Sequence, residues 1–288
     1  MKSVPFIKMH GIGNDFVVID CLANPWLDTA IGDFGAFARR VCRRAFSVGA
    51  DGLLVLQFDN DCDCRMRIFN ADGSEAGMCG NGIRCVARLL FERHVRRQEL
   101  TIRTASGLHT VLVNTDGNGA FVSAIVDMGA PVFEPSRVPV ECVSPMVDAP
   151  LDIDGRVYRL TAVSMGNPHG VIFVDDLAAL PFVEHGPLLE RHCMWPEGAN
   201  IEFASIRHGT KVIDVRTWER GVGETLACGT GACAVAAAAV ATRRLDYPVG
   251  IALRGGTLHI DVSSDWHILM TGPAEIVFDG LLDVPSAD

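Results

Sequence analysis

The chain has 288 residues, of which 49% are hydrophobic and 21% are charged, a balance typical of a soluble globular protein with ample core. Its 25 basic and 35 acidic residues give a net charge of −10. This charge argues against nucleic acid or an anionic membrane as a partner, because both require a basic surface.

Two further features bear on the cellular compartment. The first ten residues lack the apolar core of a signal peptide, and the longest apolar run, 232–241, is half of what a bilayer span needs. Ten cysteines without a secretory signal are expected to be free thiols in a reducing compartment. We therefore expect a cytoplasmic protein.

Short runs rich in β-branched residues recur along the chain and are separated by Gly, Asn, Asp and Pro. They predict strands over 16–19, 53–56, 110–113, 122–127, 171–174, 212–216, 257–262 and 275–278. Two helices are predicted, one directly after Cys79 and one over 231–244, and both end in cations that suit the negative end of a helix dipole. The second helix is apolar almost all round, so we expect it to be buried.

The strongest signal is an internal repeat. Residues 66–82 (MRIFNADGSEAGMCGNG) and 215–231 (VRTWERGVGETLACGTG) align without gaps and share arginine, glutamate, cysteine and two glycines. A second, shorter repeat agrees with the first. Gly13 and Asn14 precede the strand-like segment 16–20, and Gly166 and Asn167 precede the similar segment 171–175. Each half therefore presents one cysteine, Cys79 or Cys228, between a glycine-rich turn and a helix.

The repeat predicts an α+β fold of two pseudo-symmetric domains, each a mostly antiparallel sheet wrapped around a central helix. We expect an N-terminal half over 1–128 and a C-terminal half over 129–274, with a final strand at about 275–288 that can cross back to the first half. The proline-rich segment 128–150 is the expected interdomain linker.

A cysteine at a helix N-terminus lies near the positive end of the helix dipole, which is expected to lower the pKa of the thiol. The free N–H groups of the same helix end can hold a carboxylate. Two such cysteines, one from each half, could act on opposite faces of one bound carbon. One would remove a proton and the other would return it, which is the chemistry of a racemase or epimerase.

The motifs resemble those of diaminopimelate epimerases, a group within the cofactor-independent amino-acid racemases. The resemblance rests on 8–16 (KMHGIGNDF), 69–82 (FNADGSEAGMCGNG), 165–169 (MGNPH), Asn200 and 219–231 (ERGVGETLACGTG), which occur in the family's order and spacing. It implies interconversion of LL- and meso-2,6-diaminopimelate in lysine and peptidoglycan precursor synthesis, with no cofactor and no metal. It also implies a small amino-acid substrate and a homodimer.

The resemblance assigns roles to matching positions. Cys79 and Cys228 would be the acid–base pair, with Cys228 taking the α-proton of the LL isomer, and His169 and Glu219 would support the thiols. The backbone of four residues would hold the carboxylate at the reacting centre: Gly80, Asn81, Gly229 and Thr230. The distant end of the substrate would be read by Asn14, Asn70, Asn167, Asn200 and Arg220, with Glu219 available to an ammonium group. Where some members have a glutamine that contacts the substrate, this chain has Gly52.

Other polar residues have simpler interpretations. Glu75 and Glu224 are interpreted as turn-capping carboxylates, and Arg67 and Arg216 as structural residues in strands. Three histidines are expected to be solvated: His94, His185 and His208. Six further cysteines are expected to fill space: Cys21, Cys42, Cys85, Cys142, Cys193 and Cys233. The segment 61–64 (DCDC) is expected to be a surface turn.

Three alternatives remain open from the residues. One is a sibling racemase for proline, hydroxyproline or another amino acid, although Glu219, Arg220 and the asparagine at position 81 favour diaminopimelate. Another is a thiol-redox or metal-binding protein, which would need CxxC or Cys/His clusters. The third is a non-catalytic amino-acid binding module.

Overall fold

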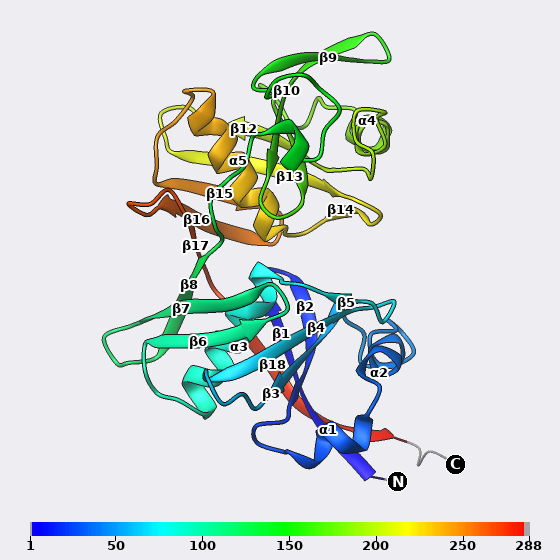
Figure 1. Cartoon of the computed structure of the whole chain (residues 1–288), viewed down its shortest axis with the longest axis vertical. Helices are drawn as coiled ribbons and strands as arrows, with labels where there is room; N and C mark the ends of the chain where they lie inside the picture. Colours follow the sequence, from blue (N-terminus) through cyan, green and yellow to red (C-terminus); the bar gives the residue numbers. More distant parts are fainter. Residues whose placement is uncertain (1, 285–288) are drawn as a thin grey trace. The chain divides into compact units, whose positions relative to one another are not determined.

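The computed structural model describes residues 2–284, and the chain divides into two compact units. Unit 1 comprises Met1–Val126 and Gly272–Asp288, and unit 2 comprises Asp127–Thr271 (Figure 1). Unit 1 is therefore built from both ends of the chain. The predicted two-domain α+β class is confirmed by the elements below.

Unit 1 contains strands along the first 127 residues and a closing strand from the C-terminal region. The strands are β1 (Lys2–Gly11), β2 (Asn14–Asp20), β3 (Gly52–Gln57), β4 (Cys64–Asn70), β5 (Glu75–Ala76), β6 (Glu99–Thr104), β7 (Gly107–Thr115), β8 (Phe121–Asp127) and β18 (Glu275–Val284). The helices are α1 (Trp26–Ile31), α2 (Phe34–Val41) and α3 (Gly80–Arg93).

Unit 2 contains the strands β9 (Ala149–Ile153), β10 (Arg156–Ser164), β11 (Pro168–Phe173), β12 (Asn200–Ile206), β13 (Val212–Glu219), β14 (Gly223–Thr225), β15 (Val249–Leu253), β16 (Gly256–Val262) and β17 (Ile268–Gly272). Its helices are a short 3-10 turn (Pro135–Arg137), α4 (Phe182–Glu190) and α5 (Gly229–Ala241).

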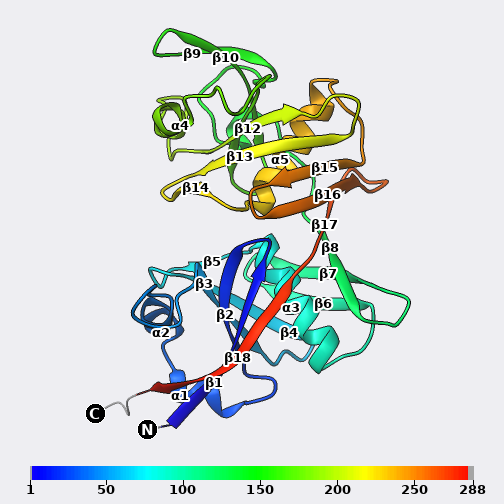
Figure 2. The same cartoon turned by 180° about the vertical axis from the view of Figure 1, so that it is seen from behind.

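The two units repeat one order of strand pairing. In unit 1, β1 and β2 are antiparallel, β2 and β3 parallel, β3 and β4 antiparallel, and β4 and β6 parallel. In unit 2, the same sequence of pairings joins β10, β11, β12, β13 and β15. The next strand beside β1 is β18, and the next beside β10 is β9. The final strand thus completes unit 1, whereas its counterpart in unit 2 precedes β10 in the chain (Figure 2).

A helix lies within the strands of each unit. Helix α3 packs against β1, β4, β7 and β18, and α5 packs against β10, β11, β12, β15 and β16. Helix α5 is mostly alanine and valine, and its residues from Gly231 to Ala239 are buried, such as Val235 with no exposed surface. Its small side chains let strands approach on every side, and each buried valine contributes about 1.5–3 kcal/mol.

Cys193 is exposed, so the expectation that it fills space was wrong. Two further expectations were wrong. The segment 128–150 is not an interdomain linker, because Val138 and Val140 lie in the core of unit 2 and the chain enters that unit at Asp127. Of the histidines expected to be solvated, His208 is exposed, but His185 is buried with its Nδ1 2.6 Å from the hydroxyl of Tyr158. His94 is exposed as a residue, although its side chain is only 18% exposed and is bonded to Asp20.

Candidate functional site

Cys79 is the N-cap of α3 in unit 1. Its backbone is extended, its Sγ accepts a hydrogen bond from the N–H of Gly82 at 3.4 Å, and the same sulfur lies 3.8 Å from Oδ1 of Asn14. A serine-like capping role is thus filled by sulfur. Gly80 and Gly82 of the first turn carry no side chain that would block a ligand from the backbone, as an anion site at a helix N-terminus requires.

The first turn of α3 is held by a set of amides and one arginine. Asn81 donates from Nδ2 to Oδ1 of Asn14 at 3.1 Å, and Asn14 donates in turn to Asp51 at 2.9 Å. The guanidinium of Arg84 donates to the carbonyl of Gly80 and to Oδ1 of Asn81, both at 3.0 Å. Arg84 has no exposed surface, so a buried cation supports the turn that presents Cys79.

The remaining predicted residue of unit 1, Asn70, ends β4 and donates from Nδ2 to Ser74 at 2.9 Å. It is exposed and belongs to the turn before the cysteine rather than to the amide cluster. Gly52 begins β3, and a Cβ atom there would lie 2.8 Å from the carbonyl oxygen of Phe69. A side chain at position 52 therefore does not fit this backbone.

Cys228 is the N-cap of α5 in unit 2 and repeats the geometry of Cys79. Its Sγ accepts from the N–H of Gly231 at 3.3 Å and lies 3.5 Å from the hydroxyl of Thr230. The expected lowering of the thiol pKa is wrong here. Burial, together with the carboxylates of Glu219 and Glu202, raises the pKa of Cys228 well above its ordinary value of 9.0. Desolvation outweighs the hydrogen bonds from Thr230 and from the N–H of Gly231, because the residue is only 7% exposed.

Polar residues predicted from the motifs surround the start of α5. His169 lies with Nε2 2.9 Å from Oδ1 of Asn167. Asn200 donates to the carbonyl of Pro168 at 3.2 Å and accepts from the backbone N–H of Arg220 at 2.9 Å. These bonds join the ends of β11, β12 and β13 at one edge of unit 2.

The two charged residues at the end of β13 have different exposures. Glu219 accepts from the hydroxyl of Thr225 at 2.5 Å and is part-buried. The side chain of Arg220 is 39% exposed, and its guanidinium donates to the carbonyl of Glu197 at 3.2 Å. An exposed fork of this kind is available to a carboxylate.

Sequence reasoning missed Glu202 and Arg84. Glu202 reaches Nδ1 of His169 with Oε1 at 2.9 Å, and both side chains have no exposed surface. In the sequence, Glu202 is one residue in a strand-like run and Arg84 is one cation in a helix. Their burial depends on strands that pack over them, so neither gave a local signal.

The repeated arginine and glutamate have a shared role that differs from the turn capping expected of the glutamates. Arg67 pairs with Glu75 through two hydrogen bonds of 2.7 Å, and Arg216 bonds Glu224 at 2.9 Å. Each pair joins a strand to the short hairpin strand that precedes the cysteine. The interpretation of both arginines as structural is confirmed.

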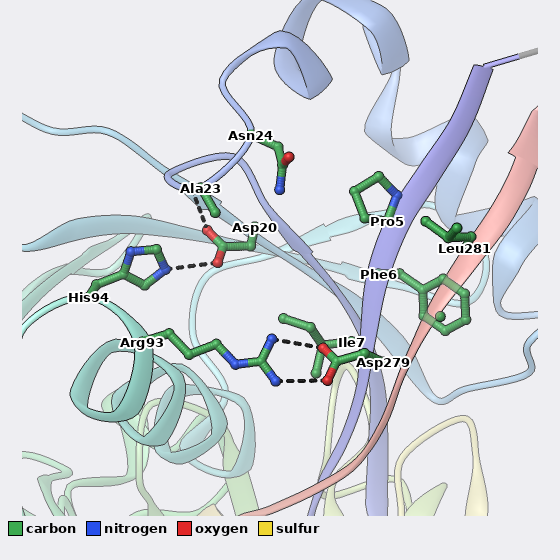
Figure 3. Close-up of a pocket in the computed structure, with 11 residues that line it drawn as sticks. Pro5, Phe6, Ile7, Asp20, Ala23, Asn24, Arg93, His94, Asp279 and Leu281 are labelled. Atoms are coloured by element: carbon green, nitrogen blue, oxygen red, sulfur yellow. Dashed lines mark hydrogen bonds and ion pairs between the residues drawn. The ribbon is translucent and has the colours of Figure 1, made fainter.

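A cavity of about 570 Å³ in unit 1 lies apart from these residues (Figure 3). It is lined by residues of β1, β2 and β18 and by the end of α3, where His94 bonds Asp20 and Arg93 bonds Asp279. Among residues 2–284, three or more His, Cys, Asp or Glu side chains nowhere gather in a way that could hold a metal ion. Within the same residues, each helix is too short or too polar to cross a membrane.

Comparison with known proteins places these features in a family. The model of the diaminopimelate epimerase family matches residues 6–134 and 161–277. A diaminopimelate epimerase of Desulfitobacterium hafniense is 44% identical over 278 residues, covering 96% of this chain and 97% of the relative. That of Pelotomaculum thermopropionicum is 46% identical over 281 residues, covering 96% and 97%.

Solved structures share the fold at low sequence identity. A phenazine biosynthesis protein of the PhzF family from Bacillus anthracis matches with a TM-score of 0.69 at 18% identity, over 99% of this chain and 100% of that chain. A hydroxyproline epimerase from Agrobacterium vitis matches with a TM-score of 0.69 at 16% identity, over 100% and 93%. With the family model and relatives above 40% identity along nearly its full length, the chain belongs to the diaminopimelate epimerase family.

Proposed function

We propose that this protein is a diaminopimelate epimerase that interconverts the LL and meso isomers of 2,6-diaminopimelate. The observation that carries the proposal is the pair of equivalent cysteine N-caps, each with its sulfur bonded to the third N–H of the following helix. Full-length relatives that are diaminopimelate epimerases support the choice of substrate.

The reaction needs one thiolate and one thiol. The thiolate takes the α-proton, the electron pair of the C–H bond moves into the carboxylate to give an enolate-like intermediate, and the opposite thiol returns a proton to the other face. With the LL isomer, Cys228 is the base and Cys79 is the acid, and the roles reverse with the meso isomer. After one turnover each sulfur has exchanged its protonation state, so the free enzyme must move one proton before the next turnover.

The helix ends would stabilise the charge that develops on the substrate. The N–H groups of Gly80, Asn81, Gly229 and Thr230 lie at the starts of α3 and α5, where the positive ends of the helix dipoles favour a carboxylate. This stabilisation is greatest when the carboxylate gains enolate character, so it lowers the barrier rather than merely tightening binding.

The distal amino-acid end would be recognised by polar side chains at the positions that match the family motifs. Arg220 can bind the second carboxylate as a two-hydrogen-bond fork, and Glu219 can meet an ammonium group. Asn14, Asn70, Asn167 and Asn200 would complete the polar contacts, and His169 would support the acid–base pair. Unsatisfied polar groups would then penalise a substrate without a second amino-acid end.

The proposal extends to the setting of the enzyme. We propose a cytoplasmic homodimer that uses no cofactor, because the acid–base groups are supplied by the chain itself. A reducing compartment would keep both thiols available.

Chiral chromatography tests the proposed substrate directly. The reduced protein is incubated with LL-diaminopimelate, and in parallel with L-proline and trans-4-hydroxy-L-proline. The proposal predicts meso-diaminopimelate as product and no epimerisation of the two ring amino acids. Turnover of proline or hydroxyproline alone would assign a sibling racemase, and turnover of none of the three would refute the epimerase.

A further inference from the structure

The two cysteine-bearing turns rest on different side chains. A Cβ atom added to Gly82 would lie 3.0 Å from a methyl group of Leu54, whereas one added to Gly231 would lie 2.5 Å from Oε1 of Glu202. Leu54 and Glu202 occupy equivalent places, because Gly52 pairs with Phe16 just as Asn200 pairs with His169. The first turn of α3 thus contacts an apolar side chain, Leu54, whereas the first turn of α5 contacts the carboxylate of Glu202.

The carboxylate of Glu202 is close to the sulfur of its half. Sγ of Cys228 lies 3.2 Å from the same added Cβ position on Gly231, so sulfur and carboxylate flank a single point at the first turn of α5. Oε1 of Glu202 bonds His169, but within the described residues Oε2 has no hydrogen-bond partner. The hydroxyl of Thr217, which faces Glu202 across β12 and β13, is also unpartnered there.

The charge is reversed at the other turn. Arg84 is fully buried and holds the carbonyl of Gly80 and the side chain of Asn81, the two residues that follow Cys79. An arginine stays protonated in a protein interior. In the alignment of the repeat the counterpart of Arg84 is Cys233, which is uncharged as a thiol. A buried cation, Arg84, therefore contacts the turn that follows Cys79, and a buried carboxylate, Glu202, contacts the turn that follows Cys228.

We propose that Arg84 and Glu202 are positioning residues that hold the two cysteines in different protonation states in the empty protein. Cys79 is then the thiolate and Cys228 is the thiol. The inference rests on the proposed function, because an epimerase of this kind needs one base and one acid at the start of each turnover. This protonation state is the one that turns over the meso isomer, for which Cys79 is the base. The LL isomer requires one proton to move from Cys228 to Cys79 before Cys228 can act as the base. In a low-dielectric interior, a nearby cation favours the thiolate and a nearby carboxylate disfavours it.

The other titratable groups around Cys228 agree with this assignment. Glu219 of β13 adds a second carboxylate, and burial adds to both in raising the pKa of the Cys228 thiol. His169 of β11 is bonded to Glu202, and Cys233 lies within α5 itself. Negative charge from β12 and β13 thus accumulates beside a helix end that would otherwise favour a thiolate.

Several titratable groups on the elements around Cys79 have hydrogen-bond partners of their own. Asp51 acts at one remove, through its bond to Asn14, and His10 of β1 accepts from the N–H of Gly13. Glu275 of β18 is paired with Arg88, one turn of α3 beyond Arg84. Arg84 contacts the first turn of α3 directly, through the carbonyl of Gly80 and the side chain of Asn81.

Alkylation of the substrate-free reduced protein by iodoacetamide tests the inference. The rate at each cysteine is followed by peptide mass spectrometry from pH 6 to about 11, and the pH midpoint of each thiol is compared, since the midpoint reports the thiolate population. We expect the midpoint of Cys79 to lie below that of Cys228. In Glu202→Gln, which preserves shape, the midpoint of Cys228 should fall by about one unit, a ten-fold gain in thiolate, while that of Cys79 stays unchanged.

Matched variants separate charge from folding. Glu224→Gln removes an equal charge from the ion pair with Arg216 in the same unit and should leave both midpoints unchanged. Arg84→Met should raise the midpoint of Cys79, and Arg84→Lys, which keeps the charge, should restore it. If Arg84→Met does not fold, the wild type and Glu202→Gln still decide the outcome.

Equal midpoints for the two thiols in the wild type, or an unchanged Cys228 midpoint in Glu202→Gln, would overturn the inference. Because alkylation requires no turnover, this outcome is distinguishable from failure of the proposed function. A protein with separated midpoints that does not convert diaminopimelate would lose the function and keep the charge asymmetry.

Discussion

Oε1 of Glu202 lies 2.5 Å from the position that a Cβ atom would take on Gly231. Any side chain at position 231 must therefore displace a buried carboxylate that is bonded to His169. The equivalent contact in the other half is with a methyl group of Leu54 at 3.0 Å, which is longer and involves no hydrogen bond.

This difference predicts unequal effects of two alanine substitutions. Gly231→Ala should separate Glu202 from His169 and move Cys228, and we expect kcat/KM for LL-diaminopimelate to fall by on the order of a hundred-fold, because a displacement of about 1 Å has such an effect on catalysis. Gly82→Ala should have a smaller effect because a leucine methyl can turn aside. Steady-state kinetics on both folded variants measures the difference, and equal losses would contradict the role given to Glu202.

Acid stability depends on Asp20, which bonds His94 at the end of α3 (Figure 3). Burial acts to raise the pKa of Asp20, but hydrogen bonds from His94 and from the N–H groups of Ala23 and Leu22 outweigh it and hold the pKa below 3.8. The folded-state pKa is thus lower than the unfolded one. The contribution of Asp20 is present above the unfolded pKa and is lost as the pH falls through the folded pKa.

We therefore expect the free energy of unfolding to decrease with falling pH below about 4.5, and to decrease less steeply in Asp20→Asn. Urea unfolding at a series of pH values, followed by circular dichroism, gives both slopes. An identical slope in the variant would show that the bond to His94 does not stabilise the charged carboxylate.

Strand β18 completes unit 1 from the far end of the sequence. It pairs with β1 along its length, Phe278 contacts the ring of Phe6 edge-on at 6.0 Å, and Leu282 packs against the core of the unit. A chain that ends at Ala274 should lose protection from hydrogen exchange in β1, β2 and α3 but keep it in α5. A chain that ends at Val284 is the matched control, since it keeps every described strand. Equal protection in the two truncated chains would contradict this role.

The sequence was sufficient to predict both central helices and the equivalence of the halves, because glycine, cysteine and apolar spacing are local signals. It did not reveal β1, whose Pro5 and Lys8 interrupt the strand pattern although Lys8 is largely buried against Asp15 and the carbonyl of Gly49. It also gave the wrong environment for Cys228. The dipole of α5 is local, whereas the opposing carboxylates arrive from β12 and β13 only when the unit folds.

Isotope exchange in D2O tests the two-thiol mechanism most directly. Reduced protein and LL-diaminopimelate are followed by proton NMR for loss of the α-proton signal and by chromatography for the meso isomer, with Cys79→Ser, Cys228→Ser and, as a control, Cys193→Ser, which alters an exposed cysteine. The expected result is deuterium at the α-carbon of the meso product for the wild type and Cys193→Ser. Each of the other two variants should be slowed by on the order of a hundred-fold or more. Full exchange and epimerisation in either Cys79→Ser or Cys228→Ser would contradict a mechanism that needs one thiol from each half.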